Sequence, residues 1–160
     1  MYRRDRIHTA LLWGGGILAI GACIALIVFF VHILLLRNSY RAACLEINDA
    51  ILSTPTAQCT ISRGDTSCPA DAATLNYYDS FLLADGVTVF NKKSEPATDK
   101  TIVLDIGGRQ LLFTGTDQNT AVNLRWITDS GEKSYTVRAD ITSFAQLNAY
   151  YTNLLHRSES

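Results

Sequence analysis

The sequence is poor in the residue types on which most catalytic and metal sites depend. Its 160 residues include three histidines, four cysteines and one methionine. None of the histidines, His8, His32 and His156, falls within the predicted sheet or between its helices, so a nucleophilic arrangement lacks a base. No two cysteines have the C-x-x-C spacing of a redox or zinc motif. We therefore expect a protein that is not an enzyme and that binds neither a metal nor a cofactor.

The sequence also has no strong excess of basic or acidic residues. The formal net charge is −1, and charged residues make up 18% of the chain. Nucleic-acid binding usually needs a basic face, so we expect no nucleic-acid partner. With 48% hydrophobic residues the chain is not predominantly disordered, and its length suits one domain.

Charge is absent altogether from one long stretch. Ala10–Leu36 contains 27 residues and no Asp, Glu, Lys or Arg. At ~1.5 Å per residue this helix would be roughly 40 Å long, which exceeds the ~30 Å hydrocarbon core of a bilayer. A soluble globular protein is thereby excluded, and we expect a transmembrane helix over residues 10–36.

The arginines around this stretch predict its direction. Arg3, Arg4 and Arg6 precede it, and Arg37 and Arg41 follow it. Because basic residues favour the cytoplasmic side, we expect a single pass through a bacterial inner membrane with the N-terminus in the cytoplasm. The predicted division is 1–9 as a cytoplasmic arm, 10–36 as the transmembrane helix and 37–160 as a periplasmic domain.

Small residues gather in the first half of the apolar stretch. Gly15, Ala19 and Cys23 are four residues apart, so they share a helix face that a second membrane helix could approach closely. They are our candidate helix-packing residues. We interpret the stretch as an uncleaved signal anchor. The alternatives are a cleaved signal peptide and a lipoprotein, because Ile20–Cys23 resembles the lipobox that precedes a lipidated cysteine.

The helix is expected to continue beyond the membrane to about residue 52. No helix breaker occurs before Ser53, and Thr54-Pro55 predicts the end of the helix. An apolar row at helical spacing occupies the outer part, namely Tyr40, Ala43, Cys44, Ile47, Ala50 and Ile51. We expect this row to pack against the exported domain.

Two cysteines bracket a predicted hairpin. With Arg63-Gly64 as a two-residue loop, Cys59 lies directly opposite Cys68, and glycine supplies the positive φ that such turns need. We therefore predict a Cys59–Cys68 disulfide, which suits an oxidising compartment, and a buried Cys44 that is free or paired with one of the two. The loop also contains Arg63-Gly64-Asp65, the tripeptide that integrins recognise, although Gly-Asp is ordinary turn chemistry.

The patterns predict an α+β domain, in which the N-terminal transmembrane helix continues into an antiparallel sheet of about 4–5 strands with packed helices. The expected elements are a helix over 69–83, strands over 87–90, 101–106, 109–114, 121–128 and 134–140, and a helix over 144–155. Ser143 and Gln146 fit a capping box at the start of the last helix, and its end from His156 is expected to fray.

These features predict a non-enzymatic subunit of a bacterial envelope-spanning assembly, of the secretion, conjugation or pilus type, whose periplasmic domain is an interaction module. Expected partners are other membrane-protein subunits and the lipid bilayer, in a hetero- or homo-oligomer. One alternative is a filament subunit, because a long N-terminal helix leading into an antiparallel sheet is similar to type IV pilins. Pilins carry a Glu early in the apolar segment, and this chain has none there. The other alternative is a membrane-anchored ligand-binding or sensor module.

Overall fold

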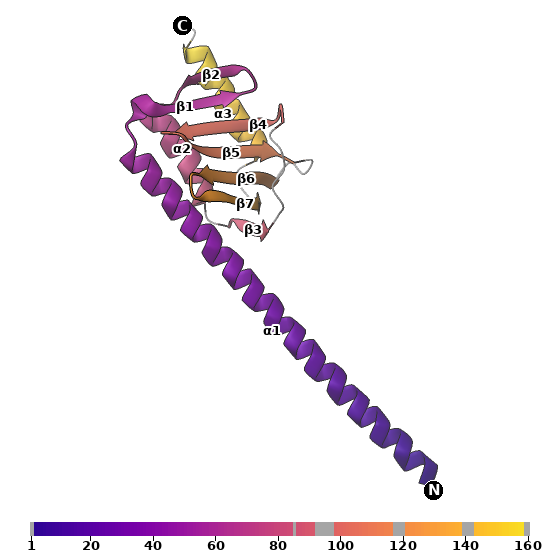
Figure 1. Ribbon diagram of the computed structural model, residues 1–160. Coiled ribbons are helices and arrows are strands. Elements are labelled where there is room, and N and C mark those ends of the chain that lie inside the picture. The colour runs from indigo at the N-terminus through magenta and orange to yellow at the C-terminus, as the bar shows by residue number, and fades with distance from the viewer. Residues whose placement is uncertain (1, 85, 92–97, 117–120, 139–142, 159–160) are drawn as a thin grey trace. The chain divides into compact units, whose positions relative to one another are not determined.

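The structure, a computed structural model, describes residues 2–84, 86–91, 98–116, 121–138 and 143–158 (Figure 1). For residues 2–15, 17 and 91 it describes the backbone alone. The helices are α1 (Tyr2–Ser53), α2 (Ala72–Leu82) and α3 (Phe144–Ser158), with one 3-10 turn at Thr56–Gln58. The strands are β1 (Cys59–Arg63), β2 (Thr66–Pro69), β3 (Thr88–Asn91), β4 (Thr101–Ile106), β5 (Arg109–Gly115), β6 (Ala121–Thr128) and β7 (Gly131–Arg138).

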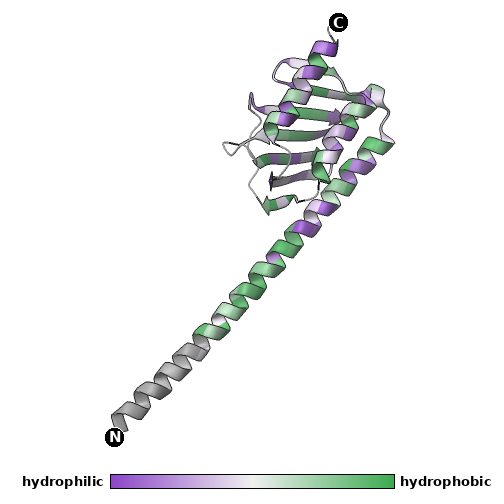
Figure 2. Ribbon diagram, turned by 180° about the vertical axis from the view of Figure 1, so that it is seen from behind, coloured by the Kyte–Doolittle hydropathy of each residue, from purple (hydrophilic) through white to green (hydrophobic). Residues whose placement is uncertain are grey.

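The chain divides into two compact units, residues 1–38 and 39–160. The first unit contains the apolar stretch of α1, whose described part Figure 2 colours mostly as hydrophobic. Residues 18–35 are all exposed, and this part of α1 is long and apolar enough to cross a membrane. It is therefore compatible with a single transmembrane helix or signal anchor. The backbone is helical throughout residues 37–41, so the expected continuation of the helix is confirmed.

The second unit is built on one antiparallel sheet in the order β2-β1-β4-β5-β6-β7-β3. The α+β class is thus confirmed, but the sheet has seven strands where about 4–5 were predicted. The β1–β2 hairpin joins the sheet because Ile61 pairs with Leu104, and β3 joins it because Val89 pairs with Val137. Both pairings link segments that are far apart in sequence, and local patterning carries no signal for them.

All three helices of the second unit cover the same face of the sheet (Figure 2). Tyr40 of α1 packs edge-on against Tyr135 of β7, and Tyr78 of α2 packs against Phe113 of β5. The Tyr78 hydroxyl also donates to the carbonyl of Leu147 in α3 at 3.0 Å. The sheet contributes to this core the buried side chains of Cys59, Ile61, Cys68, Ile102, Leu104, Ile106, Leu111, Phe113, Val122, Leu124, Trp126, Tyr135 and Val137.

The outer part of α1 belongs to this core. Every member of the predicted apolar row is buried: Tyr40, Ala43, Cys44, Ile47, Ala50 and Ile51. Ala43, Ile47 and Ala50 are completely inaccessible to solvent. The prediction that this row packs against the domain is therefore confirmed.

The β1–β2 hairpin has a different register from the predicted one. Arg63 pairs with Thr66, so the loop is Gly64-Asp65 and not Arg63-Gly64. Gly64 has a φ of +57° and holds the first loop position, where a type II′ turn requires glycine. The predicted loop places glycine second, and a turn of that kind also forces a positive φ on Arg63, which an L-residue avoids.

This register also overturns the predicted disulfide. Cys68 lies across from Ile61, whereas the carbonyl of Cys59 accepts from the amide of Ala70 at 3.0 Å. Diagonal neighbours of this kind have Cα atoms about 7–8 Å apart, beyond the ~4.4–6.8 Å that a disulfide usually spans. Cys59 and Cys68 are accordingly free and buried. Cys44 is also buried and free, which is one of its two predicted states.

The remaining elements follow the predicted pattern closely. Asp71 caps α2 by accepting from the amide of Thr74 at 2.8 Å. The Gln146 side chain accepts from the amide of Ser143 at 3.1 Å, which is the glutamine half of the predicted capping box. α3 continues to Ser158, three residues beyond the predicted end of the helix at residue 155.

Candidate interaction surfaces

The predicted helix-packing residues lie on α1 in the apolar unit. Ala19 and Cys23 are exposed, and they share one side of the helix because they are four residues apart. Gly15 is helical, but its surroundings lie outside the described side chains. The structure contains one copy of the chain, so the packing role of all three stays a prediction.

Hydroxyl groups hold the start of the second unit to the sheet and to α2. The Tyr40 hydroxyl donates to the carbonyl of Leu82 at 3.0 Å, and the Ser39 and Tyr135 hydroxyls share a hydrogen bond of 2.8 Å. Burial raises the pKa of Tyr40 far above its ordinary value, so the phenol stays neutral. These bonds satisfy polar groups that would otherwise be costly to bury among apolar side chains.

Glu46 ties the middle of the outer α1 to the sheet. One carboxylate oxygen accepts from the indole nitrogen of Trp126 at 3.0 Å, and the other accepts from the Lys133 ammonium at 2.5 Å. The hydrogen bond from Lys133, and then the one from Trp126, hold the pKa of Glu46 below its ordinary value. No local pattern signals this contact, because the partners are more than 75 residues from Glu46 in sequence.

A second polar contact joins α1 to α2. The Asn48 amide donates to Oδ2 of Asp79 at 2.9 Å, while Oδ1 of Asp79 is buried without a hydrogen-bond partner. Burial raises the pKa of the nearby Cys44 thiol to about 11. A thiol with this pKa is almost entirely protonated at neutral pH, so Cys44 is a structural group and not a reactive one.

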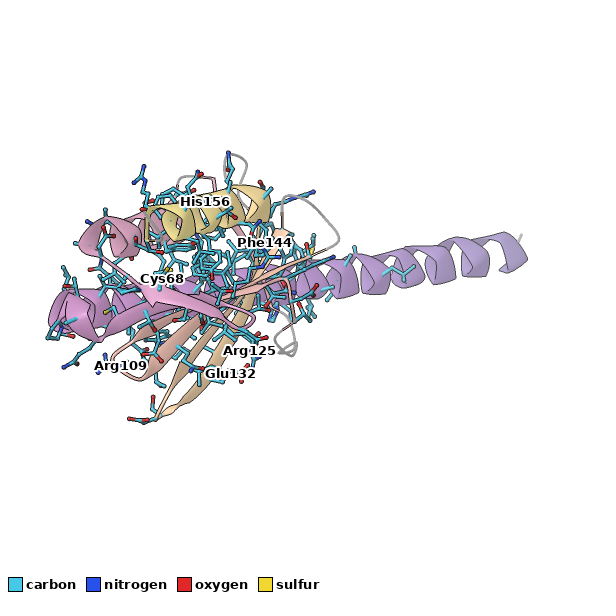
Figure 3. The ribbon with its side chains drawn as sticks, turned by 90° about the horizontal axis from the view of Figure 1, so that it is seen from above. Cys68, Arg109, Arg125, Glu132, Phe144 and His156 are labelled. Atoms are coloured by element: carbon cyan, nitrogen blue, oxygen red, sulfur yellow. The ribbon has the colours of Figure 1, made fainter. Side chains whose placement is uncertain are left out.

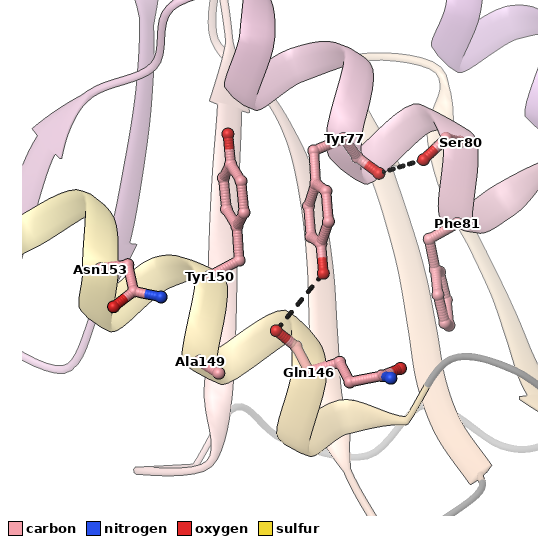
Figure 4. Close-up of a pocket in the computed structure, with 7 residues that line it drawn as sticks. All are labelled: Tyr77, Ser80, Phe81, Gln146, Ala149, Tyr150 and Asn153. Atoms are coloured by element: carbon pink, nitrogen blue, oxygen red, sulfur yellow. Dashed lines mark hydrogen bonds between the residues drawn. The ribbon is translucent and has the colours of Figure 1, made fainter.

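A groove of about 440 Å³ lies between α2 and α3 (Figure 4). The Tyr77 and Tyr150 rings stack in parallel with centroids 3.9 Å apart, and the Tyr77 hydroxyl donates to the Gln146 carbonyl at 3.4 Å. Burial raises the pKa of Tyr77. The groove is lined by Tyr77, Ser80, Phe81, Gln146, Ala149, Tyr150 and Asn153, and none of these side chains is charged. No motif or spacing in the sequence predicts this groove.

The face of the sheet opposite the helices is largely polar. Arg125 and Glu132 lie on this side, away from α3 (Figure 3), and form an ion pair with an Nε–Oε1 distance of 2.9 Å. The Thr101 and Thr114 hydroxyls share a hydrogen bond of 2.9 Å. Asp105 accepts from the amide of Gly108 at 2.9 Å and stabilises the turn. The Thr101 and Thr114 side chains are buried, so their mutual hydrogen bond satisfies both hydroxyls.

The exposed side of the outer α1 carries two unusual leucines. Leu45 is 65% exposed and Leu52 is 77% exposed, although the opposite side of the same helix is fully buried. Ala42 and Asp49 are exposed between and beside them. This exposed row was not predicted, although the seven-residue spacing of its two leucines is visible in the sequence.

The described residues contain no group of three or more His, Cys, Asp or Glu side chains that could hold a metal ion. His32 and His156 are both exposed. Comparison with known protein families, with curated proteins and with solved structures finds no match to the chain.

Proposed function

We propose that this protein is a non-enzymatic, single-pass subunit of a bacterial envelope-spanning assembly of the secretion, conjugation or pilus type. In this proposal the helix crosses the inner membrane with its N-terminus in the cytoplasm. The periplasmic domain binds other membrane-protein subunits. The observation that carries the proposal is that one helix, α1, contains both an exposed apolar stretch and a row of core residues of the folded domain.

Two further observations support a role in association. Large apolar side chains remain exposed on the folded domain, among them Leu45, Leu52 and Leu83, and exposed apolar surface of this kind is typical of interaction sites. Small residues on α1, including Ala19 and Cys23, leave room for a neighbouring helix in the membrane, where close packing drives association.

The proposal is tested by purifying the full chain from cross-linked native membranes in a mild detergent and identifying what co-purifies. We expect a defined set of other membrane proteins. Ala19→Leu should reduce their yield because it fills the small-residue face, whereas Ala25→Leu, the same change on another side of the helix, should not. A lone monomer in every preparation would rule the proposal out.

Membrane orientation is tested separately with an impermeant thiol reagent. Ser130 is exposed in the turn between β6 and β7, and the native Cys44, Cys59 and Cys68 are buried. In a Cys23→Ser background, Ser130→Cys should be labelled from outside on intact spheroplasts. Labelling only after lysis would place the domain in the cytoplasm and reverse the proposed orientation.

A pilin-like filament subunit is the second candidate. It is favoured by the succession of a long N-terminal helix and an antiparallel sheet. The mass of the intact protein from membranes separates the two candidates. An uncleaved chain supports the anchored subunit, whereas loss of an N-terminal leader supports the filament subunit.

A further inference from the structure

We propose that the exposed face of the outer α1, formed by Ala42, Leu45, Asp49 and Leu52, packs against the same face of a second copy of this chain, side by side and parallel. This face is called the outer row below. The proposal rests on the proposed function in one respect, namely that the apolar part of α1 anchors each copy in a membrane.

The spacing of the outer row is that of a helix–helix seam. Its members are three, four and three residues apart, which is the spacing of the a and d positions of a heptad. At about 100° per residue the four positions fall within ~80° of one another around the helix. They lie opposite the buried row of Tyr40, Ala43, Cys44, Ile47, Ala50 and Ile51.

The exposure of the leucines argues that this seam has an occupant. Leu45 and Leu52 lie one above the other, two turns apart, with most of their surface in water. Leucines on a solvated helix face are usually single, whereas leucines repeating every seven residues pack into a facing helix. The two leucines of the outer row therefore fit a helix–helix interface better than a solvated face.

The charges beside the outer row favour a second copy as the occupant. Arg41 lies on one side of the row and Glu46 on the other, five residues further along. In a parallel pair of helices, two residues that flank the seam on opposite sides and are five positions apart approach each other from different chains. Arg41 of each copy would thus face Glu46 of the other, and the Glu46 carboxylate can accept this bond beside those from Lys133 and Trp126.

Membrane anchoring would compensate for the weak association expected of so short a seam. A row of fewer than two heptads is too short to hold two free helices together in water. Two copies anchored in one membrane enter the periplasm parallel and at the same depth, which raises their effective concentration and fixes their register. Asp49 then meets Asp49, and this like-charge contact limits the strength of the pair.

Cysteine cross-linking of the full chain in membranes tests the proposal. In a Cys23→Ser background, Leu45→Cys and Leu52→Cys should each give a disulfide-linked homodimer on mild oxidation. Leu83→Cys is the matched control, since Leu83 is 56% exposed but is the C-cap residue of α2 and not a member of the outer row. Equal dimer yields from all three positions, or none from the α1 positions, would overturn the proposal.

Two further variants keep the test independent of folding defects. Leu45→Glu should lower the homodimer yield at position 52 by roughly tenfold, whereas Leu83→Glu should leave it unchanged. Asp49→Leu should raise the yield, because it removes the like-charge contact and completes the seam. A decrease with Asp49→Leu would contradict the proposal.

The outcome also distinguishes this proposal from the proposed function. If Leu45→Cys cross-links to a different membrane protein and not to itself, the second-copy proposal fails while the assembly role survives. If homodimers form but no other protein co-purifies, self-association stands and the assembly role fails.

Discussion

Glu46 is the residue at which one side chain joins a helix to two strands of the sheet. Its partner Trp126 is only 1% exposed, so removing the carboxylate leaves a buried indole N–H unpaired. We expect Glu46→Ala to lower the free energy of unfolding by about 1–3 kcal/mol. Glu46→Gln keeps an acceptor and should cost about 1 kcal/mol or less, as should Lys133→Met, since each loses only a partly exposed ion pair. Urea unfolding in detergent measures the order, and equal losses for Ala and Gln would show that the Trp126 bond contributes nothing.

The same carboxylate predicts a pH dependence. The pKa of Glu46 is held below its ordinary value of 4.5, first by Lys133 and then by Trp126. A carboxyl group with a lowered pKa in the folded state contributes stability above its unfolded pKa and loses it as the pH falls through the folded pKa. The stability difference between the wild type and Glu46→Gln should therefore be constant near pH 7 and shrink below about pH 4.5. A difference that grows on acidification would contradict this assignment.

Gly115 is a residue whose lack of a side chain lets α3 approach the sheet. A Cβ added there would lie 2.6 Å from Cδ1 of Phe144, closer than real side chains approach. We expect Gly115→Ala to lower the free energy of unfolding by about 1–3 kcal/mol through overpacking. Phe144→Leu in the same chain should recover part of the loss. A double-mutant cycle in urea measures this coupling, and strictly additive losses would mean that the two residues do not meet.

At the scale of elements, the β1–β2 hairpin depends on one glycine. Gly64 has a φ of +57°, which costs an L-residue about 1–2 kcal/mol. Gly64→Ala should therefore lower the free energy of unfolding by about 1 kcal/mol, whereas Asp65→Ala in the same loop should change it by less than about 0.5 kcal/mol. Urea midpoints compare the two variants. A larger loss of unfolding free energy from Asp65→Ala than from Gly64→Ala would contradict the assignment of the positive-φ position to Gly64.

The elements that the sequence predicted best are those whose pattern is local. β4 and β6 have the predicted bounds, because apolar and polar residues alternate along strands with one buried face. The hairpin register failed because moving the glycine by one loop position shifts the pairing of both strands, and the hydrophobic pattern is compatible with both registers. The disulfide failed with it, since the prediction for Cys59 and Cys68 depended on that register.

At the scale of the whole molecule, the sequence predicted which parts are apolar but not what they meet. The buried row on α1 could be read from helical spacing alone. The partners of that row could not, since Tyr135 and Leu82 come from strands and helices whose placement depends on long-range pairing. The groove between α2 and α3 is likewise a product of helix packing, and no residue in it stands out in the sequence.

The division of the chain at residue 39 gives α1 a structural role that a membrane anchor alone does not have. The second unit includes residues 39–53, which supply Ile47 and Ile51 to the core. Burying one such side chain stabilises a fold by about 1.5–3 kcal/mol, and a whole row approaches the ~5–15 kcal/mol net stability of a domain. None of the described side chains of the first unit is buried.

We therefore expect a fragment of residues 39–160 to be soluble and to unfold cooperatively, and a fragment of residues 54–160 to aggregate or lose fixed tertiary structure. Near-UV circular dichroism and urea unfolding compare the two. Ile47→Asp in the longer fragment should reproduce the defect of the shorter one, because it places an unpaired charge in the same buried row. Leu45→Asp makes the same change on the exposed side of α1 and should leave the fragment folded. A well-folded 54–160 fragment would show that the outer α1 only rests against a domain that is complete without it.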